Sequence, residues 1–246
     1  MSSLLVAHTR YLLLEQLRVP IGLVASAFFP AASMLAFVVP FAGQDPMAAT
    51  QATGSMMLIG AMSAALMGLS ITVAQDRELP WNPYLRTLPA GPLPRFAGRI
   101  ITTMITMLVA TIPVLLIAAL FTEATITPPK LLLGLLALLG ASVPFMLIGL
   151  FIGFVLPSKA AIGVSQVVFF PVAILGGLFM PPQIMPGFVQ AVSPYVPARG
   201  AGELLWAVTA GSTPNTVALI MLGVWTVAAA LAAGWAYKRD EGRRFS

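Results

Sequence analysis

Residues 131–156 read LLLGLLALLGASVPFMLIGLFIGFVL, a run of 26 residues without a charged side chain. An α-helix rises about 1.5 Å per residue, so a helix of this length can cross a hydrocarbon core roughly 30 Å thick. Five other stretches are uncharged and similarly long, and each predicts a further membrane-spanning helix. These stretches are residues 21–42, 54–74, 100–121, 160–180 and 215–237.

The composition of the whole chain is that of an integral membrane protein. Hydrophobic residues make up 59% of the chain, charged residues make up 9%, and the mean hydropathy is +0.94. Backbone groups that face lipid must be paired within the membrane, and the alternating ten-residue segments of a barrel are absent. The loops at 43–53 and 122–130 are too short to fold alone. We therefore expect an all-α fold that forms one transmembrane domain over residues 1–246.

The distribution of Lys and Arg predicts how the chain is oriented. Basic residues near the ends of spans prefer the cytoplasm, and eleven of the thirteen fall on one predicted side, with only Lys130 and Arg199 on the other. With six spans, both termini are expected to be cytoplasmic, and a bacterial cytoplasmic (inner) membrane fits best. The net charge of +5 then reflects orientation, so no nucleic-acid partner is expected.

The six apolar stretches contain no group that could use an ion gradient. An ionisable side chain near the bilayer midplane costs at least ~2.5 to 3.5 kcal/mol, and proton- or sodium-driven pumps normally keep one there. The chain also lacks a GxxxxGK[ST] phosphate-binding loop. If the protein moves a solute uphill, the energy must come from a partner. We expect no cofactor and no metal in this chain, and its lack of cysteine excludes disulfides and thiolate ligands.

Two cytoplasmic segments stand out beside the spans. Residues 1–20 predict a helix that lies on the membrane surface, with a basic juxtamembrane tail as the alternative. The loop at 75–99 reads QDRELPWNPYLRTLPAGPLPRFAGR and combines four arginines with five prolines. Its apolar segment Tyr84 to Leu88 fits a groove on a soluble partner. Anchoring at the membrane interface by Trp, Tyr and Arg is the other interpretation, and the residues alone do not separate the two.

The outer loop at 181–214 is both long and apolar. Pro186 and Pro197 could each open a short helix, and helices of that length are marginal in water. The sequence therefore predicts a re-entrant hairpin between spans five and six that dips back into the outer leaflet. Arg199 and Glu203 lie one helical turn apart and could pair, which favours a structural role over a catalytic one.

Small and adaptable side chains within the spans indicate packing and a possible path. Gly149 and Gly153 form a GxxxG pattern, and the run from Ala228 to Gly234 is similarly small, so both favour close approach of helices. Thioether, hydroxyl and aromatic side chains could line a path for an amphipathic or lipid-like molecule. The alternative is that these residues pack helices together or contact lipid, which such residues do more often. The candidate path residues are Met57, Thr102, Thr106, Phe169 and Phe170.

The block from 149 to 207 carries a resemblance to a known family. It reads GLFIGFVLPSKAAIGVSQVVFFPVAILGGLFMPPQIMPGFVQAVSPYVPARGAGELLWA. This block resembles the membrane subunits of ABC transporters of the type 2 permease family, especially the small six-span drug, antibiotic and lipid exporters. The stretch LRTLP at 85–89 is similar to the first inner loop of that family, and the resemblance covers nearly the whole chain.

The resemblance implies partners and residue roles. It implies a dimer with a second permease chain, identical or related, that works with two copies of a cytoplasmic ABC ATPase, which would bind ATP and Mg. The inner loop would supply a coupling helix against the ATPase, and the outer hairpin would form a gate. The implied coupling residues are Glu78, Leu85, Arg86, Leu88 and Pro89, and the implied gate residues are Met180, Pro181, Phe188, Arg199 and Glu203.

An ATP-driven exporter subunit, embedded in membrane lipids, is therefore the leading interpretation. An ATP-independent channel or a membrane assembly factor explains the uncharged spans equally well, but it leaves the apolar inner loop without a partner. An intramembrane enzyme is disfavoured. His8 is the only histidine and lies outside the spans, while Asp45 and Asp76 flank the second span at opposite membrane faces. We therefore predict no catalytic residue.

Overall fold

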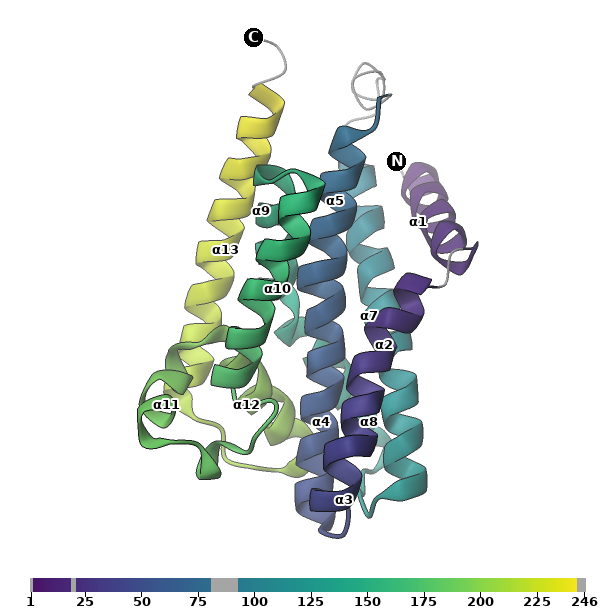
Figure 1. The fold of residues 1–246 in the computed structure, drawn as a ribbon. Coiled ribbons are helices and arrows are strands. Elements are labelled where there is room, and N and C mark those ends of the chain that lie inside the picture. The colour runs from purple at the N-terminus through teal and green to yellow at the C-terminus, as the bar shows by residue number, and fades with distance from the viewer. Residues whose placement is uncertain (1, 19–20, 81–92, 243–246) are drawn as a thin grey trace.

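The protein is a bundle of helices that run roughly side by side (Figure 1). The computed structural model describes residues 2–18, 21–80 and 93–242, and every regular element within these ranges is a helix. The predicted all-α class is therefore confirmed for the part of the chain that the structure describes.

Among the described residues, five helices are long and apolar enough to cross a membrane, and one further apolar helix is shorter. The five are Pro46–Glu78, Phe96–Phe121, Pro128–Val155, Ser158–Leu175 and Thr216–Asp240, and the shorter one is Ser26–Ala42. Each of the six overlaps one predicted stretch. Six crossings stay a prediction, because the first of these helices falls short of the length of the others.

The helices before the inner loop contain two π-helical turns. The first apolar segment consists of α2 (Ile21–Ser33), η1 (Met34–Val38) and α3 (Val39–Ala42), and it is preceded by α1 (Ser2–Arg18). The second consists of α4 (Pro46–Met62), η2 (Ser63–Gly68) and α5 (Leu69–Glu78). The predicted N-terminal helix is confirmed as a helix, while its placement on a membrane surface stays a prediction.

The remaining helices follow the inner loop. They are α7 (Leu93–Phe121), α8 (Pro128–Ala141), α9 (Val143–Val155), α10 (Ser158–Leu175) and α13 (Thr216–Gly242). Between α10 and α13 the outer segment forms η3 (Pro182–Ile184), α11 (Gly187–Val192), η4 (Ser193–Tyr195) and α12 (Pro197–Ala210). The two short helices predicted to open at Pro186 and Pro197 are thus confirmed as α11 and α12.

Two helix boundaries differ from the sequence prediction for identifiable reasons. The loop expected at 43–53 is mostly helix, because the Asp45 carboxylate accepts hydrogen bonds from the backbone N–H groups of Met47 (2.8 Å) and Ala48 (2.9 Å) and so starts α4 early. The fourth predicted span is divided into α8 and α9 at Ser142. Pro144 explains the division, since it lacks the N–H that an uninterrupted helix would use.

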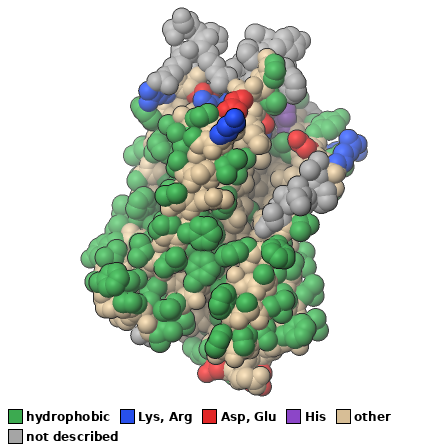
Figure 2. All heavy atoms as spheres, in the orientation of Figure 1, with side chains coloured by type: hydrophobic (Ala, Val, Ile, Leu, Met, Phe, Trp, Pro, Cys, Tyr) green, Lys and Arg blue, Asp and Glu red, His purple; other side chains and the backbone are tan. Residues whose placement is uncertain are grey.

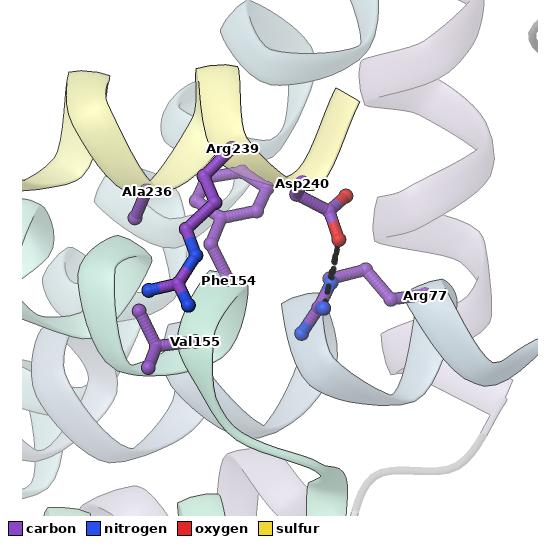
Figure 3. Close-up of a pocket in the computed structure, with 6 residues that line it drawn as sticks. All are labelled: Arg77, Phe154, Val155, Ala236, Arg239 and Asp240. Carbon is purple, nitrogen blue, oxygen red and sulfur yellow. Dashed lines mark hydrogen bonds and ion pairs between the residues drawn. The ribbon is translucent and has the colours of Figure 1, made fainter. Parts of the chain in front are cut away.

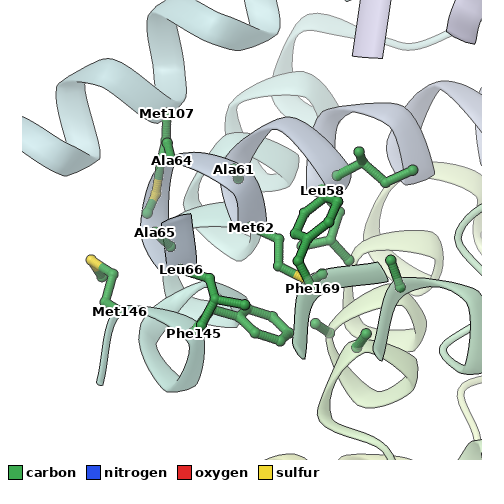
Figure 4. Close-up of a cluster of buried hydrophobic side chains, with 14 of the residues drawn as sticks. Leu58, Ala61, Met62, Ala64, Ala65, Leu66, Met107, Phe145, Met146 and Phe169 are labelled. Atoms are coloured by element: carbon green, nitrogen blue, oxygen red, sulfur yellow. The ribbon is translucent and has the colours of Figure 1, made fainter. Parts of the chain in front are cut away.

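The second apolar segment is the centre of the bundle. In its most apolar window 72% of the residues are buried, compared with 17% for α13. Figure 4 shows side chains from this segment, among them Leu58, Met62 and Leu66, packed with Phe145 of α9 and Phe169 of α10. The chain therefore buries its apolar core around α4, η2 and α5.

The glycines of the GxxxG pattern allow α9 to lie directly against this central segment. A Cβ atom at Gly149 would lie 2.5 Å from the carbonyl oxygen of Ala65, and one at Gly153 would lie 2.8 Å from the carbonyl oxygen of Ser70. Both distances are far below van der Waals contact, so these positions have no room for a larger residue. The packing role predicted for the two glycines is confirmed.

This close contact predicts opposite effects for two glycine-to-alanine substitutions. Gly149→Ala is expected to lower the free energy of unfolding by about 1–3 kcal/mol, because the added methyl group forces α9 away from η2. Gly163→Ala is the matched control, since a Cβ there meets nothing within 4 Å. The control is expected to gain about 0.5–1 kcal/mol from helix propensity. Unfolding by SDS titration in mixed micelles measures both, and equal effects of the two substitutions would contradict the packing account.

Candidate functional site

Charged side chains gather at the ends of the bundle. On the face drawn in Figure 2, basic side chains lie at one end and acidic ones at both, while the wall between is apolar. The N-terminal helix α1 and the C-terminal end of α13 lie at the same end of the bundle (Figure 1). We call this the inner end, because α5 and α7 meet the inner loop there.

Arg77, in the last turn of α5, contacts two other helices at the inner end. Its Nε and one terminal nitrogen contact the Asp240 carboxylate at 2.9 and 2.7 Å (Figure 3). Its other terminal nitrogen donates to the carbonyl oxygens of Gly153 (2.8 Å) and Leu156 (3.2 Å). These carbonyls belong to the end of α9, where no intrahelical donor is available to them. One guanidinium therefore ties α5 to both α9 and α13.

The residues on either side of Arg77 hold two further helices. Asp76 forms an ion pair with Arg99 of α7. The Glu78 carboxylate accepts hydrogen bonds from the backbone N–H of Ser158 (2.8 Å) and from its hydroxyl (2.6 Å), at the start of α10. Three consecutive side chains of α5 thus bind four other helices, α7, α9, α10 and α13, at the point where the chain enters the inner loop.

An aromatic cluster completes the inner end. Phe96 of α7, Phe154 of α9 and Tyr237 of α13 meet edge to face, with ring centroids 4.9 to 5.6 Å apart. Such pairs contribute about 0.5–1.5 kcal/mol each beyond the area they bury. The residues that flank the inner loop are consequently held by polar and apolar contacts together.

The predicted coupling residues are only partly within the described structure. Glu78 lies at the base of the loop and binds Ser158. Leu85, Arg86, Leu88 and Pro89 lie outside the described residues, and their ATPase contacts stay predictions.

At the opposite, outer end, α12 is fixed in place by buried polar contacts. Arg199 and Glu203 form the predicted ion pair at 2.6 Å, and both side chains are largely buried. Glu203 also accepts a hydrogen bond from the backbone N–H of Asn215 (3.1 Å), just before α13. The indole N–H of Trp206 donates to the Ser55 hydroxyl at 3.1 Å, which links α12 to α4.

Small residues let α12 approach its neighbours closely. A Cβ at Gly200 would lie 2.3 Å from the carbonyl oxygen of Ala218, and one at Gly176 would lie 2.5 Å from the Cβ of Ala198. The α12 helix is therefore wedged between the end of α10 and the start of α13.

The predicted gate residues occupy two different environments. Arg199 and Glu203 lie within the wedged helix α12. Met180, Pro181 and Phe188 are exposed on the preceding limb of the outer segment, where 75% of Phe188 is accessible. The gate assignment itself stays a prediction.

The predicted path residues do not line a common cavity within a single copy of the protein. Met57 lines a cavity of about 90 Å³ between α4, α7, α8 and α12. Thr102 and Thr106 are buried on α7, where the Thr106 hydroxyl donates to the side-chain oxygen of Gln16 in α1 at 2.7 Å. Phe169 is buried in the core, whereas Phe170 is exposed and meets Phe29 edge to face. Sites for drug-sized ligands are roughly 300–1,000 Å³, so the cavity beside Met57 is too small for one.

The sequence did not point to several residues that organise the two ends. Arg77 and Asp240 are 163 positions apart, and Trp206 and Ser55 are 151 apart. The sequence offers one indication for Arg77 and Asp240, which is that each lies at the end of an apolar stretch. Within the described residues no group of three or more His, Cys, Asp or Glu side chains could hold a metal ion.

Comparison with known proteins identifies a family and a relative that this chain resembles. Residues 3–209 match the family described as ABC-2 type transporter. A protein of Bacillus subtilis (strain 168), YvfS, which carries the name of a transport permease, is 24% identical over 168 residues. That alignment covers 68% of this chain and 69% of the relative.

The buried ion pair of α12 predicts a non-additive pair of substitutions. Glu203→Gln is expected to lower the free energy of unfolding by about 3–5 kcal/mol, because it leaves the buried Arg199 charge unpaired. Adding Arg199→Met removes that charge, and the double variant is expected to recover most of the loss. SDS titration of the wild type, of Glu203→Gln and Arg199→Met singly, and of the double variant measures this. Additive losses would show that the pair is not what holds the helix.

Proposed function

The chain belongs to the ABC-2 type transporter family, and from this membership we propose that it is the membrane subunit of an ATP-driven exporter whose ATPase is a separate polypeptide. The family match extends from α1 into α12. Permeases of this family are the transmembrane components of ABC transporters and work with an ABC ATPase. The direction of transport, the solute and the number of subunits are part of the proposal.

The position of the ionisable side chains carries the proposal. Within the described spanning helices, charged residues lie in the first or last turns, as Arg99, Lys130 and Lys159 do. An ion-driven pump needs such a group near the midplane. The sequence also lacks a phosphate-binding loop of the GxxxxGK[ST] type. The free energy for transport is therefore assigned to ATP bound with Mg by the partner.

The inner loop is the proposed docking site for the ATPase. Its base is fixed by the contacts of Asp76, Arg77 and Glu78, so a displacement of the loop is passed directly to α7, α9, α10 and α13. This rigidity supports a coupling role for Leu85, Arg86, Leu88 and Pro89, which follow within the loop. The α1 helix lies against α7, where a Cβ at Gly98 would lie 3.1 Å from the Cβ of His8. We place α1 at the membrane surface beside the ATPase.

The translocation path is proposed to lie between two permease chains, identical or related. The cavity beside Met57 is too small for a drug-sized solute. By contrast, α2 and α10 expose aromatic side chains, including Phe28 (68% accessible) and Phe170 (42%). A path along such a face suits an amphipathic, drug-like or lipid-like solute, because rings adapt to varied apolar shapes. Two ATPase copies would then serve two permease chains.

Orientation follows from charge and topology. The inner end carries most of the basic residues of the described chain, together with α1 and the last turns of α13, so we place it in the cytoplasm of a bacterium, beneath the inner membrane. The chain has no native cysteine, which makes single-cysteine labelling specific. An impermeant maleimide added to intact cells is expected to label Thr213→Cys and not Lys238→Cys, and the reverse pattern would overturn this orientation.

The docking assignment predicts the phenotype of a loop variant. Leu85→Asp with Leu88→Asp is expected to reach the membrane normally and to lose at least about tenfold in affinity for the ATPase, because charge replaces two apolar anchors. Ile184→Asp, at an exposed apolar position of the outer segment, is the matched control and should keep the ATPase. Quantitative co-purification in mild detergent measures both.

Normal ATPase association by the double variant would refute the docking site. If the wild-type chain itself recruits no ATPase, the result would instead favour the alternative of an ATP-independent channel or an assembly factor.

A further inference from the structure

Asp240 is a buried carboxylate in the last turns of α13. Its side chain is only 4% accessible and contacts the Arg77 guanidinium, which is itself 21% accessible. A buried carboxylate is costly unless it is paired and hydrogen-bonded, and this pair meets that need. Residues 210–246 lie beyond the match to the family, so the match assigns no role to Asp240.

The geometry of Arg77 makes this pair more than a local contact. While two of its nitrogens hold Asp240, the third holds the carbonyl oxygens of Gly153 and Leu156. The carboxylate therefore fixes the plane of the guanidinium, and the guanidinium fixes the end of α9 just before the turn into α10. Figure 3 shows Arg77 of α5 and Asp240 of α13 facing each other in the space between the two helices.

Arg77 also lies directly between the two other side chains that anchor the inner loop. Asp76 binds α7, and Glu78 binds the start of α10. A movement of the loop at this point must displace all three sets of contacts together. The α13 helix, whose apolar window is the least buried of the five spans, is joined to this unit by the Arg77–Asp240 pair and by Tyr237.

We propose that Asp240 is a positioning residue for energy coupling. Acting through Arg77, it holds the base of the inner loop and the α9–α10 turn against α13, so that the C-terminal end of α13 moves with the loop during the ATPase cycle. The inference rests on the proposed function, because it requires an ATPase on the loop. It adds a helix outside the family match to the moving unit.

The first test uses the purified complex of the full chain with its ATPase. Asp240→Asn keeps the size of the side chain and removes its charge, so it is expected to retain the ATPase. The permease changes the rate at which the ATPase hydrolyses ATP, and in the variant this change should be smaller by about fivefold or more. Asp240→Glu restores the charge and should recover most of that change.

Arg239→Gln is the matched control for removing one charge. Arg239 lines a small pocket together with Arg77 and Asp240 (Figure 3), but its guanidinium lies over the Trp235 ring at 5.1 Å. It is expected to behave as the wild type. A purely structural role for Asp240 would lower the yield and stability of the complex without changing the hydrolysis rate per complex.

A second measurement does not depend on the stability of Asp240→Asn. Lys238 is exposed on the same turn of α13, and the chain has no native cysteine, so Lys238→Cys accepts a single fluorescent label. Adding ATP and orthovanadate to the labelled complex is expected to change the fluorescence, and the labelled permease without ATPase should show no change.

The outcomes separate this inference from the function on which it rests. A wild-type chain that binds no ATPase overturns both. If the wild-type complex forms and its ATP hydrolysis is coupled, two results overturn the role of Asp240 alone. One is that Asp240→Asn hydrolyses ATP like the wild type, and the other is that the fluorescence of the label at position 238 does not change.

Discussion

The hydrocarbon core of a membrane does not tolerate an unpaired charge, and the rest of this structure depends on that constraint. The described spanning helices keep their charged side chains near their ends, and the buried carboxylates Asp240 and Glu203 are each paired with an arginine. Polar interactions are therefore concentrated at two levels, an inner end organised by Arg77 and an outer end organised by Glu203. Any work done by the molecule must be transmitted between these levels by the apolar stretches of the helices, which contain no Asp, Glu, Lys or Arg between their two ends.

Close packing is what makes those helices able to transmit movement. The central segment of α4, η2 and α5 is enclosed by its neighbours, and Gly149 and Gly153 bring α9 into backbone contact with it. A π-helical turn lies at the point of this contact, and such turns are frequent at functional sites. Because packed interiors deform little, a displacement at the base of the inner loop moves whole helices and is not absorbed locally.

Periodicity and composition were enough to predict the fold class, because runs of about twenty apolar residues have few alternatives in a membrane. Turn chemistry also predicted α11 and α12, since Pro186 and Pro197 mark helix starts. The Arg199–Glu203 pair could be predicted because its members are one turn apart. The Arg77–Asp240 pair could not, since nothing in a single sequence tells which distant helix ends meet. The residues that line a translocation path could not be predicted from the sequence either, because helix packing uses the same Met, Thr and Phe residues that a path would.

The central claim is that this chain carries no energy source and receives one at its inner loop. The most direct measurement is the mass of the intact complex, purified from its native membrane in mild detergent and analysed by native mass spectrometry. We expect two permease chains, this one with a copy of itself or a related chain, bound to two copies of a protein that contains a GxxxxGK[ST] loop. Recovery of the folded chain from its native membrane with no nucleotide-binding partner bound would contradict the account.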